Sequence, residues 1–283
     1  MHQLPLEVHE LIKLALQEDQ AFNDPTTESL IDKKLKVDVN LVAKQSGIIA
    51  GIEVFIAVLG YIDTDLKFQR LIQDGEEVKQ NDTILKFNGS AYSILRGERT
   101  ALNFIQRMSG IASQTRAYVN IIEDLNATIV DTRKTLPGHR FLDKYSIVQG
   151  GGRNHRFNLA DGILIKDNHL VALSALGLNN TDAVTLAIKN SSHTINVEIE
   201  TETIEEVRSA LFAGAQIIML DNMDVDTMRE AVKLINGKAI VEASGGINLS
   251  TVRSVAETGV DLISVGSLTH SVQGLDISLD IKK

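Results

Sequence analysis

The chain has 283 residues, of which 43% are hydrophobic and 23% charged, with a mean hydropathy of +0.02 and a formal net charge of −9. This composition is ordinary for a globular enzyme, and the acidic balance argues against nonspecific nucleic-acid binding, which needs a basic surface. No cysteine is present, which excludes disulfides and thiolate metal sites, and no apolar run reaches the roughly 18 residues of a membrane span. The N-terminus lacks the charge order of a signal peptide, so a cytoplasmic location is expected.

The first part of the chain predicts a small α+β domain. Apolar residues in Leu4–Leu16 repeat at helical spacing, and one or two long helices are expected over Ser93–Leu125. Between them, Ile52–Leu59 predicts a helix that crosses a mostly antiparallel sheet. The strands of that sheet are expected at Asp38–Ala43, Gly47–Ala50, Leu66–Leu71 and Thr83–Phe87.

From residue 128 the pattern changes to short apolar runs that each end in a polar residue or glycine. Helical segments such as Thr203–Ala213, Asp226–Ile235 and Thr251–Thr258 separate most of the runs. This alternation predicts a parallel sheet buried on both faces, and polar groups at successive strand ends favour an α/β barrel with its site at that rim. An open doubly wound sheet is the competing architecture, but no G-x-G-x-x-G fingerprint follows the first strand. The six clear runs are Thr128–Val130, Gly162–Ile165, Ile195–Ile199, Ile217–Leu220, Ala239–Val241 and Leu262–Val265.

The expected fold class is therefore α/β. An incomplete α/β barrel over residues 113–267 follows an α+β domain over residues 1–112. In the final stretch, Leu275 and Ile277 begin an alternation of apolar and polar residues that predicts one strand. We expect this strand to pair with the N-terminal domain, so that residues 268–283 join it.

The first candidate cluster follows directly after the run that ends at Val130. Thr132, Arg133 and Lys134 stand there, flanked by Asp131. Arginine binds oxyanions through two parallel hydrogen bonds and lysine adds a point charge, so the cluster suits a phosphate or a carboxylate. A solvated loop is the alternative interpretation.

The second cluster combines glycines with cations. Three glycines at 150–152 let the backbone approach a ligand closely and present its amides. Arg153, His155 and Arg156 follow at once. A flexible turn explains the glycines but not the adjacent cations, so anion binding is the favoured interpretation.

A lysine and three acids occupy the ends of further strands. Lys166 follows the run that ends at Ile165, where it can be an electrophile, a Schiff-base former or an anion ligand. Glu198 and Glu200 face the same side of one strand, and Asp221 ends the next. These carboxylates can hold Mg²⁺ together with substrate phosphates, or accept hydrogen bonds from ribose hydroxyls. Simple pairing with Lys166 or Arg133 is the alternative.

Glycine-containing loops follow the last two predicted strands. Ser244, Gly245 and Gly246 follow one strand, and Gly266 and Ser267 follow the next. Phosphate sites in such barrels are often built from the loops after the last two strands, through backbone N–H groups. A phosphate site is therefore expected here.

Taken together, these motifs resemble the quinolinate phosphoribosyltransferase family. The resemblance rests on Glu98–Phe104, Ser109–Ala112, Asp131–Thr135, Asn154–Arg156 and Lys166–His169, in this order along the chain. It runs over nearly the whole sequence. It implies a type II phosphoribosyltransferase with an N-terminal open-faced sandwich and a seven-stranded α/β barrel. The implied reaction joins quinolinate (pyridine-2,3-dicarboxylate) to phosphoribosyl pyrophosphate, and releases pyrophosphate and carbon dioxide to give nicotinate mononucleotide for NAD biosynthesis.

The resemblance also implies roles for the candidate residues. Arg99 would reach the site of the neighbouring subunit in a homodimer, with assembly beyond a dimer left open. Glu200 and Asp221 would face the ribose and Mg²⁺, the one cofactor expected. Thr132 and five basic residues would line the quinolinate and phosphate pocket, and two loops would hold the 5′-phosphate. The basic residues are Arg133, Lys134, His155, Arg156 and Lys166, and the loops are Ser244–Gly246 and Gly266–Ser267.

Within this set, we expect Lys134, Lys166, Glu200 and Asp221 to act in catalysis. Two other functions remain as rivals. One is an aldolase-type barrel that forms a Schiff base at Lys166, and the other is a non-catalytic protein that binds a pyridine dicarboxylate or a nucleotide. No partner among nucleic acids or membranes is expected.

Overall fold

The computed structural model describes residues 4–282, which form two compact units. Unit 1 comprises the described residues up to 116, residues 135–151, and those from 268 onward. Unit 2 comprises residues 117–134 and 152–267. Residues 135–151, which the sequence places in the barrel, therefore belong to unit 1. The reason is that helix α5 (Arg140–Gln149) buries Leu142 in the hydrophobic core of that unit.

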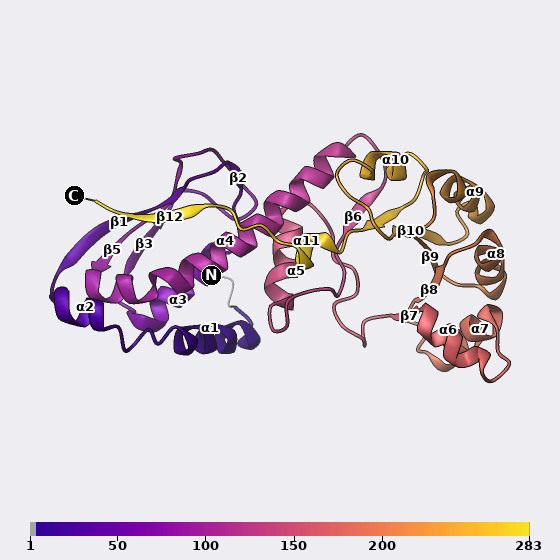
Figure 1. The fold of residues 1–283 in the computed structure, drawn as a ribbon, viewed down its shortest axis with the longest axis horizontal. Coiled ribbons are helices and arrows are strands. Elements are labelled where there is room, and N and C mark those ends of the chain that lie inside the picture. Colours follow the sequence, from indigo (N-terminus) through magenta and orange to yellow (C-terminus); the bar gives the residue numbers. More distant parts are fainter. Residues whose placement is uncertain (1–3, 283) are drawn as a thin grey trace. The chain divides into compact units, whose positions relative to one another are not determined.

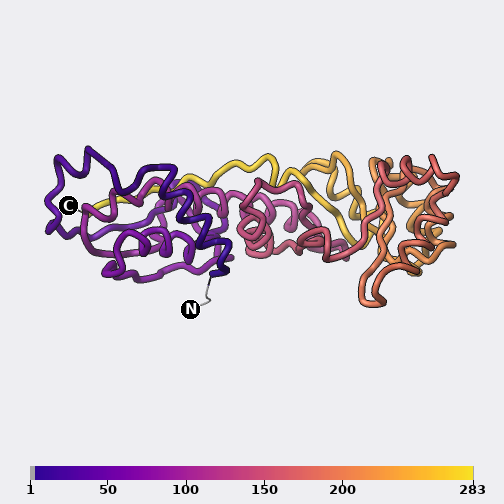
Figure 2. The backbone as a smooth tube through the Cα atoms, turned by 90° about the horizontal axis from the view of Figure 1, so that it is seen from below, coloured from indigo at the N-terminus to yellow at the C-terminus, as the bar shows by residue number. Residues whose placement is uncertain are grey.

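Unit 1 contains a four-stranded antiparallel sheet in the order β12-β1-β5-β3. The expected C-terminal strand is β12, and it pairs with β1 from Val39 opposite Ile281 to Ala43 opposite Ile277. The C-terminal segment, yellow in Figures 1 and 2, thus returns to the indigo and purple part of the chain. A separate pair, β2 with β4, lies outside this sheet. The strands are β1 (Lys36–Ala43), β2 (Gly47–Ile48), β3 (Lys67–Arg70), β4 (Glu77–Val78), β5 (Thr83–Ser90) and β12 (Ile277–Ile281).

The helices of unit 1 bury apolar stripes. Helix α1 buries Val8, Ile12 and Leu16, which are four residues apart and so lie on one face. Helix α3 begins where the Asp74 carboxylate accepts the backbone N–H groups of Gly51 and Ile52. The helices are α1 (Leu6–Glu18), α2 (Pro25–Leu30), α3 (Ile52–Ile62), α4 (Ala91–Ile121, as far as residue 116), α5 and α11 (Ser267–His270, from residue 268).

A buried ion pair links two helices of unit 1. The guanidinium of Arg107 on α4 donates to both carboxylate oxygens of Asp143 on α5, at 3.0 and 2.9 Å. Asp143 is fully buried, and Arg107 also donates to the carbonyl of Thr269. Because a buried carboxylate without a partner is costly, this pair fixes α5 to unit 1.

Unit 2 is built on a six-stranded parallel sheet in the order β6-β11-β10-β9-β8-β7. All six apolar runs named above form these strands. A one-residue parallel bridge between Val130 and Arg153 extends the sheet beyond β6, so Arg153 takes the place where a seventh strand would lie. The strands are β6 (Thr128–Val130), β7 (Ile163–Ile165), β8 (Val197–Thr201), β9 (Ile217–Asp221), β10 (Ile240–Ser244) and β11 (Leu262–Ser264).

Helices cover this sheet, as expected of an α/β unit. Figure 1 shows α7, α8 and α9 in a row beside strands β8, β9 and β10. The start of α8 is set by a capping box between Thr203 and Glu206, and its end by Gly214 in a left-handed conformation. The helices are α6 (Asp167–Ser174), α7 (Asn180–Asn190), α8 (Ile204–Ala213), α9 (Val225–Ile235) and α10 (Val252–Ala256). Among the described residues, no helix combines the length and apolar character needed to cross a membrane.

Candidate active site

The polar ends of the parallel strands meet at one edge of the unit 2 sheet. In the β9–β10 pair, Asp221 lies opposite Ser244, and in the β8–β9 pair Glu200 lies opposite Met219. Because all strands run in the same direction, their carboxyl ends lie at the same edge. The sheet therefore brings Glu200, Asp221 and Ser244, which are far apart in the sequence, to one rim.

Lys166 and the rim acids form a charged group. The Nζ atom of Lys166 makes an ion pair with the Glu200 carboxylate. Burial raises the pKa of Asp221, and the charge of Glu200 raises it further, against the opposing charges of Lys166 and Lys134. The structure thus brings together all four residues expected to act in catalysis.

Two guanidinium groups lie in the same region. Burial lowers the pKa of Arg156, and the charge of Arg133 lowers it further, whereas Glu198 and Glu200 act in the opposite direction. Arg156 donates from Nη1 to the carbonyl of Gly162 at 2.9 Å. The Nε atom of Arg133 is buried and has no hydrogen-bond partner among residues 4–282. A buried charged donor without an acceptor is costly, which makes an anionic ligand the natural partner for Arg133.

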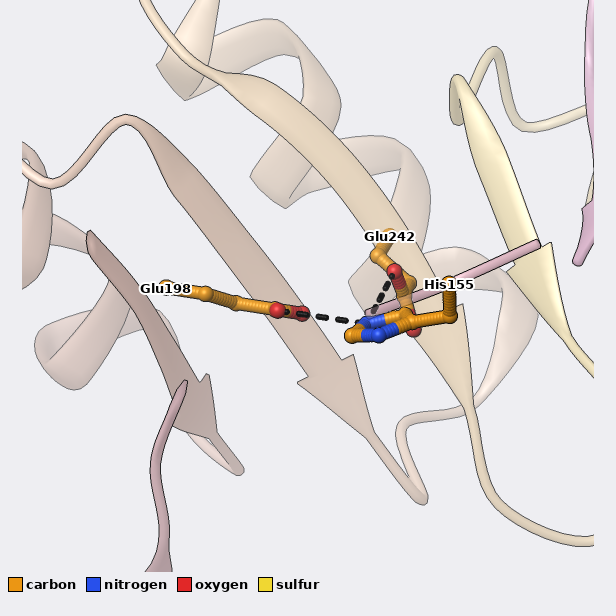
Figure 3. A group of neighbouring side chains, drawn as sticks. All are labelled: His155, Glu198 and Glu242. Atoms are coloured by element: carbon orange, nitrogen blue, oxygen red, sulfur yellow. Dashed lines mark ion pairs between the residues drawn. The ribbon is translucent and has the colours of Figure 1, made fainter. Parts of the chain in front are cut away.

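His155, the residue before Arg156, forms ion pairs with two glutamates (Figure 3). Its Nε2 atom is 3.2 Å from the Glu198 carboxylate and 3.4 Å from that of Glu242. Burial acts to lower the pKa of His155, but the two carboxylates outweigh burial and raise the pKa to about 10. The backbone N–H of Arg156, however, donates to Nδ1 at 2.7 Å, and this hydrogen bond is incompatible with a ring protonated on both nitrogens. A backbone N–H can only donate, so Nδ1 keeps its lone pair and the hydrogen stands on Nε2.

The glycine loop after β10 depends on one residue without a side chain. Gly245 has φ of +94°, and a Cβ there would lie 2.2 Å from Oδ1 of Asn222 and 2.9 Å from its backbone nitrogen. Asn222 itself has a positive φ of 54° and donates its N–H to the carbonyl of Ser244 at 3.0 Å. Gly246 is exposed with a positive φ. Gly266 and Ser267 follow β11 in the same unit.

The remaining predicted residues lie in different settings. Lys134 is exposed, and its backbone N–H donates to the Thr132 hydroxyl at 3.0 Å. Arg153 contributes its backbone to the bridge, and its side chain is exposed. Arg99 lies on α4 in unit 1 and is also exposed. His169 has a structural role, because its Nδ1 accepts the N–H of Lys166 at 2.9 Å where α6 begins.

Sequence reasoning missed Glu242 as a site residue. The apolar run that precedes it ends at Val241, so Glu242 reads as a strand-end residue, whereas β10 continues to Ser244 and buries it completely. The signal that could have identified it is its spacing of two residues from Ser244, which puts both on one face of the strand.

Comparisons with known protein families bear on this site. The model of the quinolinate phosphoribosyl transferase C-terminal domain matches residues 111–280, and that of the N-terminal domain matches residues 24–109. The chain belongs to this family. The two family matches confirm that the chain is related to the quinolinate phosphoribosyltransferases, as its sequence motifs indicate.

Individual relatives agree with this assignment. The chain is 41% identical over 276 residues to a probable carboxylating nicotinate-nucleotide pyrophosphorylase of Bacillus subtilis, covering 98% of this chain and 94% of that protein. It is 42% identical over 291 residues to a decarboxylating, mitochondrial quinolinate phosphoribosyltransferase of Nicotiana tabacum, covering 97% and 82%. The crystal structure of NadC from Streptococcus pyogenes superimposes with a TM-score of 0.93 at 38% identity, covering 100% of both chains. The α/β fold class with an N-terminal sandwich and a barrel-like second domain is thereby confirmed.

Proposed function

We propose that this family member transfers the phosphoribosyl group of phosphoribosyl pyrophosphate to the ring nitrogen of quinolinate. Pyrophosphate and carbon dioxide leave, and nicotinate mononucleotide, an NAD precursor, is formed. The observation that carries the proposal is the gathering of cations at the rim of unit 2, with the buried Nε of Arg133 lacking an acceptor among the described residues. Quinolinate is a dianion, and a dianion removed from water needs such charges.

Each group of rim residues has a part in this proposal. Arg133 and Arg156 bind the two ring carboxylates, since guanidinium groups match carboxylates in shape and charge. Lys134 and Lys166 add positive charge beside the reacting groups. Thr132 anchors the turn that carries Lys134. The loops Ser244–Gly246 and Gly266–Ser267 offer backbone N–H groups to the 5′-phosphate.

The acids stabilise the charge that develops on the sugar. When the bond to pyrophosphate breaks, positive charge builds on the ribose ring, and the carboxylates of Glu200 and Asp221 lie at the rim to face it. The ring nitrogen of quinolinate then forms the new bond to the anomeric carbon. The nitrogen becomes cationic, and its charge stabilises the electron pair left on the adjacent carbon when carbon dioxide departs; a proton then binds to that carbon in place of the lost carboxylate.

The donor set at the rim fits Mg²⁺. Glu200 and Asp221 offer carboxylate oxygens, which this ion prefers, and the pKa of Asp221 is raised by burial and by the charge of Glu200, a repulsion that a cation relieves. When bound with the pyrophosphate group, Mg²⁺ neutralises the charge of the leaving group. Chelation by EDTA should therefore stop turnover, and restored Mg²⁺ should recover it.

We further propose a homodimer in which Arg99 completes the neighbouring site. The exposed position of Arg99 on α4 supports this, together with the family's expected arrangement. Mixing an Arg99→Ala protein with a Lys166→Ala protein should restore part of the lost activity through hybrid dimers. No recovery, once subunit exchange has been verified by mass spectrometry, would contradict the arrangement. The absence of cysteine supports a reducing compartment, and we propose the cytoplasm.

Pyrophosphate release tests the reaction. Purified protein with quinolinate, phosphoribosyl pyrophosphate and Mg²⁺ should release pyrophosphate, whereas nicotinate, which lacks the second carboxylate, should support little release. The ion pair of Lys166 with Glu200 disfavours the Schiff-base alternative, which needs an uncharged amine. Borohydride should therefore trap no adduct on Lys166.

A further inference from the structure

A second layer of charged side chains lies beneath the rim. Glu198 stands two residues before Glu200 on β8, and Glu242 stands two residues before Ser244 on β10, so each faces the same side of the sheet as its rim neighbour. The side chains of Glu198 and Glu242 are only 4% and 1% exposed. Figure 3 shows both pointing at the His155 ring, which reaches them from the segment after Arg153.

The spacing of these three residues would also suit a cation, but the hydrogen bonding argues against one. A histidine that binds a metal donates its other ring N–H to an acceptor. Here the other nitrogen, Nδ1, accepts the N–H of Arg156 at 2.7 Å. Nε2 therefore carries a hydrogen and is directed at the two carboxylates, of which Glu198 is the nearer. The cluster holds an imidazole in place.

Holding the ring also holds the backbone that carries Arg156. The N–H of His155 donates to Oδ1 of Asp131 at 2.9 Å, and Nδ1 of the same ring receives the next N–H along the chain. Asp131, which directly follows β6, is fully buried. The imidazole thus links the buried glutamates to the backbone of Arg156. Burial and the neighbouring charge of Arg133 lower the pKa of Arg156, and Glu198 acts in the opposite direction.

We propose that Glu198 and Glu242 are positioning residues for recognition of the ring dicarboxylate. They hold the His155 imidazole from beneath in its Nε2–H form and so fix the backbone that presents Arg156 to the ligand. The identity of the ligand rests on the proposed function. The positioning role itself does not depend on turnover.

Two glutamine substitutions distinguish a positioning role from a purely electrostatic one, because the two roles predict opposite changes in the affinity for a dianion. Glu198→Gln and Glu242→Gln each remove a negative charge near an anion site while keeping the shape of the side chain. If the glutamates acted only through their charge, the substitutions would tighten binding of a dianion. If they position His155, the substitutions weaken it, by roughly tenfold to a hundredfold, as is typical when a supporting partner is lost.

The probe is benzene-1,2-dicarboxylate, which carries two adjacent carboxylates but no ring nitrogen and so cannot react. Isothermal titration should give a weaker dissociation constant for both glutamine variants. In turnover, KM for quinolinate should rise while KM for phosphoribosyl pyrophosphate stays unchanged. The control is Glu205→Gln, the same change at an 83% exposed residue of α8, which should bind like the unmodified protein.

A spectroscopic readout follows the ring directly. The ¹⁵N shifts of the His155 imidazole, identified by their loss in His155→Gln, should report the Nε2–H form in the unmodified protein and a changed ring signal in Glu198→Gln. Should a glutamine variant fail to fold, Glu198→Asp and Glu242→Asp, which withdraw the carboxylate from Nε2, must show the same weakening. Unchanged or tighter binding, or an unaltered ring signal, overturns the proposal. Absence of pyrophosphate release by the unmodified protein would instead count against the proposed function alone.

Discussion

Replacement of Arg133 by alanine gives a quantitative test of the anion site. Its Nε atom is buried and lacks a hydrogen-bond acceptor within residues 4–282, so we expect the ligand to supply one. A guanidinium donates two parallel hydrogen bonds to a carboxylate, and each hydrogen bond to a charged group contributes about 1.5–3 kcal/mol. Losing both costs about 3–6 kcal/mol of transition-state stabilisation, which is a fall in kcat/KM of roughly 10²- to 10⁴-fold.

Steady-state kinetics with quinolinate as the varied substrate measures this loss. Arg133→Lys keeps the charge but loses the paired geometry, so it should fall between the unmodified and alanine proteins. Arg208→Ala removes an arginine that is 63% exposed on α8, and should leave kcat/KM unchanged. If Arg133→Ala kept kcat/KM within threefold of the unmodified protein while folding normally, the reasoning from its buried donor would be refuted.

Three further substitutions test other parts of the structure. Gly245→Ala should destabilise the protein by about 1–3 kcal/mol in urea unfolding and weaken binding of phosphoribosyl pyrophosphate. The reason is that Gly245 has φ of +94° and that a Cβ there would lie 2.2 Å from Oδ1 of Asn222. An unchanged unfolding midpoint would argue against this loop geometry. Asp143→Ala should cost about 3–5 kcal/mol of unfolding free energy, because it removes the carboxylate that balances the charge of Arg107. A loss under about 1 kcal/mol would show that the pair is dispensable. Lys166→Ala should lower kcat more than 100-fold. The unfolding free energy should change by no more than about 1 kcal/mol, since the ion pair of Lys166 with Glu200 is partly exposed. A near-normal kcat would remove Lys166 from the mechanism.

Much of the fold was predictable because the strands are short and almost purely apolar. Runs such as Ile217–Leu220 are buried on both faces, and the polar residue that ends each run marks the rim. The extent of unit 1 was harder to predict. Helix α5 follows the Asp131–Lys134 cluster in sequence, yet Leu142 and the buried pair of Asp143 bind it to unit 1. Packing between segments far apart in the chain decides this, and local patterns carry no signal for it.

The site was predictable where charge follows a strand end and less so where charge lies inside the sheet. The basic residues of the two clusters stand out because cations beside glycines or hydroxyls are unusual at a buried edge. Glu242 did not stand out, since a glutamate after an apolar run is usually solvated, and only the length of β10 shows that it is buried. The role of His169 at the start of α6 likewise depends on a local hydrogen bond that residue type alone does not reveal.

The measurement that tests the whole account most directly follows one labelled carboxylate. Quinolinate carrying ¹³C in the carboxylate next to the ring nitrogen is incubated with phosphoribosyl pyrophosphate, Mg²⁺ and the purified protein. We expect one labelled carbon dioxide for each pyrophosphate released, and no label released when the other carboxylate carries it. Pyrophosphate without labelled carbon dioxide, or no pyrophosphate at all, would contradict the claim that this rim of cations joins a dicarboxylate to an activated sugar.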